Sequence, residues 1–202
     1  MKTRLIPVLL VVAIASSCSK TKTQTVTNTV VTTDTLTAVE TPIKTTIAQG
    51  ILVDTFELIN EGPYEQGTVF YSSKNGTISQ LGAIFPIGTY RVCLWDMSDS
   101  ALLVAASVAC TDTSKFAYAA ISPIHITANH KYMVSSNTGT AGNYYSYGLK
   151  TFGSLAYPYS VGSITLVSYS YIAGLAAAFP THTTDHTELV NSDIIFQADK
   201  TN

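Results

Sequence analysis

The fold of this 202-residue chain is decided by the stretch Gly88-Thr89-Tyr90-Arg91-Val92-Cys93-Leu94-Trp95-Asp96. Apolar residues such as Val92 and Leu94 alternate there with Arg91, Cys93 and Trp95, and successive side chains of a β-strand point to opposite faces. The stretch therefore predicts a strand with two distinct faces. We expect Trp95, in the middle of it, to be a core residue.

From about Gly50 onward, similar short segments alternate with turn signals, of which Asn75-Gly76 is the strongest. The only candidate helix is residues 172–179, which contain Gly174 and end before Pro180. Short strands at this spacing predict an all-β fold, a single β-sandwich of jelly-roll or immunoglobulin-like type. The other predicted strands are residues 51–57, 67–72, 77–85, 101–108, 116–121, 125–126, 131–136, 144–150, 163–172 and 192–197.

Residues 1–17 predict a lipoprotein signal peptide. Lys2 and Arg4 precede an apolar run over residues 5–14, and Ala15-Ser16-Ser17 are small enough for a peptidase cleft. The cysteine that follows, Cys18, resembles the lipobox cysteine of bacterial lipoproteins, which is acylated and becomes the first mature residue. We therefore expect lipidation of Cys18 and localisation to the bacterial cell envelope, at the outer membrane. An ordinary signal peptide with a chance cysteine is the alternative.

A change of composition predicts the domain boundaries. Residues 18–48 are dominated by Thr, contain no aromatic residue, and cannot bury a core of their own. They are predicted to be a lipidated Cys18 followed by a disordered tether, and residues 49–202 to be the β-sandwich domain. Alternation of Val and Thr over residues 25–33 leaves an added β-strand as the alternative.

Charge and composition limit the classes of partner that we expect the protein to bind. The formal net charge is −2, only 12% of residues are charged, and Lys and Arg form no run, so nucleic-acid binding is disfavoured. No motif calls for a cofactor. The predicted partners are a membrane, through the lipid anchor, and a glycan or an envelope protein.

Two cysteines, Cys93 and Cys110, remain beside Cys18. An oxidising compartment permits a disulfide between them. A turn near residues 96–101 would instead place Cys93 opposite Val104, and two buried free thiols are the alternative.

Several short motifs together carry a family resemblance. They are the segment around Asn75-Gly76-Thr77-Ile78, the strand ending in Leu94-Trp95-Asp96, the step Pro123-Ile124-His125-Ile126-Thr127-Ala128, and the closing Asp193-Ile194-Ile195-Phe196. This series resembles the bacterial domain-of-unknown-function family 4082. The resemblance implies a β-sandwich of exported bacterial proteins, sometimes found beside carbohydrate-active enzymes. It implies no established activity and no catalytic residues.

Polar motifs in the chain are better explained by turns than by chemistry. His182 and His186 flank Asp185, but they follow a proline in a Thr-rich segment, and a zinc site would need further ligands. Asp96 and Asp99 are ordinary turn residues, although their oxygens would also suit calcium. No nucleophile elbow or interpretable catalytic triad is present. We therefore predict neither a metal site nor an enzyme.

Tyrosines are concentrated between residues 144 and 171. Exposed tyrosines suit sugar faces and protein partners, although strand packing also favours them. Tyr144, Tyr145 and Tyr147 follow a Gly-rich turn and are the predicted contacts. The predicted function is a non-catalytic envelope lipoprotein that binds a glycan or a protein. A structural or assembly component is the alternative, and a small hydrolase is a distant third.

Overall fold

A computed structural model describes residues 5–11, 25–31, 37–59, 62–139, 144–149, 157–184 and 191–200. The chain divides into two compact units, Met1–Leu36 and Thr37–Asn202. In the first unit, β1 (Leu5–Val11) and β2 (Thr25–Val31) form an antiparallel pair, so the Thr-Val tract contains a strand. Cys18 lies outside the described residues.

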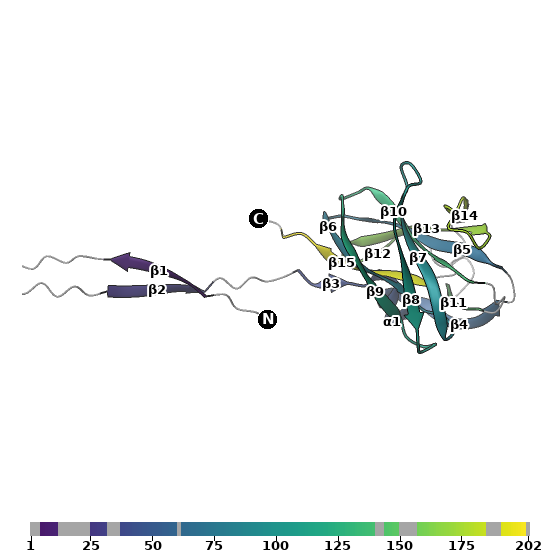
Figure 1. Ribbon diagram of the computed structural model, residues 1–202, viewed down its shortest axis with the longest axis horizontal. Coiled ribbons are helices and arrows are strands. Elements are labelled where there is room, and N and C mark those ends of the chain that lie inside the picture. The colour runs from purple at the N-terminus through teal and green to yellow at the C-terminus, as the bar shows by residue number, and fades with distance from the viewer. Residues whose placement is uncertain are drawn as a thin grey trace, which may run out of the picture. The chain divides into compact units, whose positions relative to one another are not determined.

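The second unit is a β-sandwich of two antiparallel sheets, as the sequence predicts, and it also contains one short helix (Figure 1). One sheet has seven strands, and β14 pairs with β13 outside its main order. In spatial order that sheet contains β12 (Tyr159–Val161), β13 (Ile164–Ala173), β5 (Tyr64–Ser72), β10 (Lys131–Asn137), β7 (Gly88–Asp96) and β8 (Leu102–Cys110), with β14 spanning His182–Thr184.

The other sheet has four strands, in the order β3 (Val39–Glu40), β15 (Ser192–Ala198), β6 (Gly76–Ala83) and β9 (Ala117–Ile126). Two further strands, β4 (Leu52–Ile59) and β11 (Tyr144–Leu149), pair with each other. Two segments predicted as separate strands around Pro123 join into the single strand β9.

The main core lies between the two sheets and contains fully buried residues of both, such as Phe70, Leu94 and Phe196. The opposite face of β7 belongs to a second, smaller cluster that contains Cys93 and Trp95. The two-faced strand predicted from the alternation is therefore present. Trp95 is only 4% exposed, which confirms it as a core residue.

The possible disulfide between Cys93 and Cys110 is absent, and both cysteines are buried and free. Across the β7–β8 pair, Cys93 lies opposite Ala105, whereas Cys110 lies opposite Gly88. Five residues along a strand correspond to roughly 17 Å, whereas a disulfide needs Cα atoms within about 7 Å. The structure instead contains two buried free thiols, which was the alternative interpretation of the sequence.

The tether prediction is wrong for residues 37–48, which belong to the second unit. There β3 pairs with β15, and α1 (Pro42–Ala48) buries Ile43 and Thr46 on one side. Proline suits the first turn of a helix because the N–H that it lacks has no partner there. The helix is too short to be stable alone, so its stability comes from packing that a Thr-rich sequence does not reveal. Residues 174–179, by contrast, form no helix.

A buried carboxylate attaches α1 to the four-stranded sheet. Asp193 on β15 is fully buried and accepts hydrogen bonds from the backbone N–H groups of Ile43 (3.0 Å) and Lys44 (3.2 Å). The hydroxyl of Tyr118 on β9 donates a third bond at 2.8 Å. The first N–H groups of a helix have no partner within it, so Asp193 satisfies two of them. Burial raises the pKa of Asp193 to about 6, although these hydrogen bonds oppose the shift.

This pKa predicts how stability depends on pH. Between pH 7 and pH 5 the folded protein takes up a proton at Asp193, whereas the unfolded chain, with an aspartate pKa of about 3.9, does not. Acidification in this range therefore stabilises the fold through this group. Asp193→Asn should remove that gain, and the exposed control Asp99→Asn should keep it. Urea unfolding at the two pH values measures the difference, and an unchanged pH dependence in Asp193→Asn would contradict the prediction.

Candidate functional site

A buried site with a charged pair lies on the face of the seven-stranded sheet that points away from the main core. On β5, Phe70 belongs to the main core, and alternation sends Glu65 and Val69 to the other face. The register places Asn137 of β10 opposite Glu65. Glu65 is 0% exposed, so its carboxylate depends on partners within the protein.

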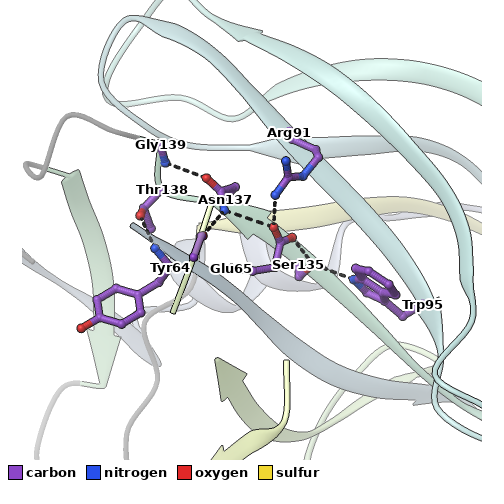
Figure 2. Close-up of polar contacts among 9 residues, drawn as sticks. Tyr64, Glu65, Arg91, Trp95, Ser135, Asn137, Thr138 and Gly139 are labelled. Carbon is purple, nitrogen blue, oxygen red and sulfur yellow. Dashed lines mark hydrogen bonds and ion pairs between the residues drawn. The ribbon is translucent and has the colours of Figure 1, made fainter. Parts of the chain in front are cut away.

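Three side chains from β7 and β10 contact this carboxylate, and together with Trp95, which bonds to one of them, they form what we call the Glu65 network (Figure 2). Arg91 Nη2 lies 2.6 Å from Glu65 Oε2, and Asn137 Nδ2 donates to the same oxygen at 3.3 Å. Ser135 Oγ donates to Glu65 Oε1 at 2.6 Å. Trp95 Nε1 in turn donates to Ser135 Oγ at 2.8 Å. The carboxylate thus joins three neighbouring strands.

The Glu65 network is closed to large molecules. Ser135 is fully buried, and Phe179 packs edge-on against Trp95 with ring centroids 5.8 Å apart. Burial, and next the charge of Glu65, raise the pKa of the neighbouring Cys93 to about 12, so the thiol is protonated at neutral pH. Ser135 and Cys93 are both buried, so neither is accessible to a dissolved substrate as a nucleophile. The chemistry of this network is therefore that of a structural support.

The support extends to the backbone at the end of the sheet. Asn137 Nδ2 also donates to the carbonyl of Gly174 at 3.0 Å, directly after β13. The backbone N–H of Tyr64 donates to Thr138 Oγ1 at 2.9 Å, and that of Gly174 donates to the Pro63 carbonyl at 2.8 Å. The network therefore holds the start of β5 beside the end of β13.

An exposed group of rings lies at this position, and we call Tyr64, Tyr171 and His182 the aromatic cluster. Tyr171 is 37% exposed, and its ring meets that of Tyr64 edge-on with centroids 6.0 Å apart. The ring of His182 stacks on Tyr171 at 5.3 Å, and the buried Tyr169 supports Tyr171 at 5.9 Å. In Figure 2 the ring of Tyr64 points away from Glu65. The cluster offers apolar ring faces together with polar atoms, which suits a sugar.

The sequence identified this cluster only in part. Tyr171 belongs to the tyrosine-rich region, but the predicted contacts Tyr144, Tyr145 and Tyr147 lie in β11, whose side chains are outside the described residues. Tyr64 was missed because it reaches Tyr171 only through the pairing of β5 with β13. No local signal in the sequence indicates that contact.

The polar residues that the sequence analysis weighed as metal ligands have other contacts where the structure describes them. Asp96 Oδ1 accepts bonds from the backbone N–H of Ser98 at 2.8 Å and from its hydroxyl at 2.7 Å, and His130 Nε2 lies 2.8 Å away. Asp99 Oδ1 accepts the N–H of Ala101. The contacts with Ser98 and Ala101 are turn contacts. Within the described residues no three His, Cys, Asp or Glu side chains gather as metal ligands, and Asp185 and His186 lie outside them.

Neither protein-family models nor curated proteins match this chain. The resemblance to domain-of-unknown-function family 4082 therefore stays a prediction. No helix among the described residues has the length and the apolar composition needed to cross a membrane.

The Glu65 network predicts unequal effects of removing its two charges. Arg91→Met leaves the buried Glu65 carboxylate without its cation, which should cost roughly 3–5 kcal/mol of unfolding free energy. Glu65→Gln should cost less, because the Arg91 side chain is 30% exposed and stays hydrated. Urea unfolding followed by fluorescence of Trp95, the one tryptophan of the chain, measures both.

The exposed Lys131→Met on β10 is the matched control and should change stability by less than about 0.5 kcal/mol. Equal losses for Arg91→Met and Glu65→Gln, or a larger loss for Glu65→Gln, would contradict a buried charge at Glu65.

Proposed function

We propose that this protein is a non-catalytic lipoprotein of the bacterial cell envelope whose β-sandwich binds a glycan through the aromatic cluster. The observation that carries the proposal is the exposed ring of Tyr171, held between the rings of Tyr64 and His182. Sugar rings have apolar faces that stack on aromatic rings, and their hydroxyl groups need polar partners at the edge. The cluster provides both.

Rigidity of the cluster supports the proposal. Ordering loose side chains opposes binding, so a surface that is already ordered binds more tightly. Tyr171 packs on the buried Tyr169, Thr138 holds the backbone of Tyr64, and Asn137 of the Glu65 network holds the turn at Gly174. The cluster thus needs little rearrangement to receive a ligand.

The second candidate is a structural or assembly component of the envelope that binds no small ligand. The observation that favours it is the uncharged edge of the seven-stranded sheet at β8, which suits contact with another protein. A glycan-binding test of the aromatic cluster separates the two candidates.

Membrane attachment tests the envelope assignment. Cys18→Ala removes the predicted acylation site, so the protein should move from the membrane fraction to the soluble fraction. A lipoprotein with two or more acyl chains stays bound, whereas a chain without lipid does not. Fractionation of cells followed by immunoblotting measures the shift, with Cys110→Ala as the matched cysteine control. Membrane retention of Cys18→Ala at the wild-type level would contradict the proposal.

Ring stacking at Tyr171 tests the binding function. We expect the full chain to bind at least one glycan on an array that includes xylan, mannan, β-glucan and peptidoglycan fragments. Tyr171→Ala should weaken that binding about tenfold, which corresponds to about 1.4 kcal/mol. Tyr71→Ala, on the same strand as Tyr64 but without a ring contact to the cluster, is the control. Unchanged binding by Tyr171→Ala, or no glycan bound at all, would favour the structural candidate.

A further inference from the structure

The strand β8 forms an edge of the seven-stranded sheet. In the part of the chain that the structure describes, its only hydrogen-bonded neighbour is β7. Its nine residues include neither a charged residue nor a proline, and they read Leu102-Leu103-Val104-Ala105-Ala106-Ser107-Val108-Ala109-Cys110. Such an edge presents a row of N–H and C=O groups to any strand that can align with it.

The other edges of the two sheets that form the sandwich are protected. The strand β3 has two residues, and β12 and β14 have three each, so none of them can form a long ladder. The longer edge strand β9 contains Pro123, which cannot donate a backbone hydrogen bond. Natural proteins use these devices against edge-to-edge pairing. Among the edges of these two sheets, β8 is the long one that contains neither a charged residue nor a proline, and its register with β7 shifts once, between Leu94 and Trp95.

We propose that β8 pairs antiparallel with β8 of a second copy of this chain, so that two seven-stranded sheets join across a two-fold axis. Because the strand has no charge, pairing it with itself brings no like charges together. The turn that follows the strand carries Asp112 and Lys115, which pair with each other at 2.9 Å and give that flank no net charge.

The exposure pattern of β8 determines the register. Ala105, Ser107 and Ala109 are exposed by alternation, and Leu102 and Leu103 are exposed where the register with β7 shifts. The exposed pairs Leu103 with Ala109 and Ala105 with Ser107 lie symmetrically about Ala106. A continuous sheet keeps like faces together, so exposed residues must lie opposite exposed residues. A register centred on Ala106 does this, and it places Leu103 opposite Ala109 of the second copy. The side chains in the centre are small, so nothing holds the two strands apart.

Charge substitutions test both the pairing and its register. The purified full chain in detergent should have the mass of a dimer by light scattering, with the detergent contribution subtracted. Leu103→Lys with Ala109→Lys places like charges opposite each other at both ends of the interface and should give monomers. Leu103→Lys with Ala109→Glu places opposite charges there and should restore the dimer. Ile87→Lys, at a 76% exposed position outside β8, is the control.

A crosslink provides an independent measurement. Position 106 lies on the proposed axis, and directly opposed residues of antiparallel strands have Cα atoms roughly 4.5–5.5 Å apart, within the span of a disulfide. Ala106→Cys should therefore form covalent dimers on mild oxidation. Ile87→Cys controls for random collision, and the native Cys93 and Cys110 are buried.

Three results would overturn the proposal. They are a monomeric wild type at micromolar concentration, a folded Leu103→Lys, Ala109→Lys variant that stays dimeric, and failure of the Ala109→Glu combination to restore the dimer. If the double-lysine variant does not fold, the Ala106→Cys crosslink decides alone. In that case, a yield of covalent dimer from Ala106→Cys no higher than from the control Ile87→Cys contradicts the proposed pairing. None of these results bears on glycan binding at the aromatic cluster.

Discussion

A buried carboxylate must find its counter-charge and hydrogen-bond donors within the protein. Glu65 imposes this requirement on the outer face of the seven-stranded sheet. A charge in a medium of low dielectric is stable only with a cation and hydrogen-bond donors around it. Arg91 and Ser135 supply these from two different strands, so the requirement of one group aligns β5, β7 and β10. Asn137 extends the alignment to the turn at Gly174, and through it to the surface that carries the aromatic cluster.

Asp193 plays a corresponding part in the other sheet. Its two oxygens hold the first turn of α1 and the hydroxyl of Tyr118, so a short helix without strong intrinsic stability becomes part of the core. The two cysteines that could have crosslinked the domain are instead free and buried in different clusters. Buried carboxylates, rather than a disulfide, therefore join distant segments of this fold.

The two proposed surfaces lie at opposite ends of the seven-stranded sheet. The aromatic cluster is carried by β5, β13 and β14, whereas β8 is separated from β5 by β10 and β7. Pairing through β8 would leave both copies of the aromatic cluster free. Two linked copies would also bind a repeating glycan more tightly than one copy, because the second contact becomes intramolecular. The two proposals are thus compatible, although each stands on its own observations.

Local patterns in the sequence determined most of the strands and one central core residue. The alternation around Val92 and Trp95 is enough to define a strand with two buried faces, because side chains alternate along any strand. The position of Tyr64 beside Tyr171, the contacts of Glu65, and the docking of α1 by Asp193 were decided by the tertiary structure alone. Each of them joins residues far apart in the chain, and sheet pairing, not spacing along the sequence, brings such residues together.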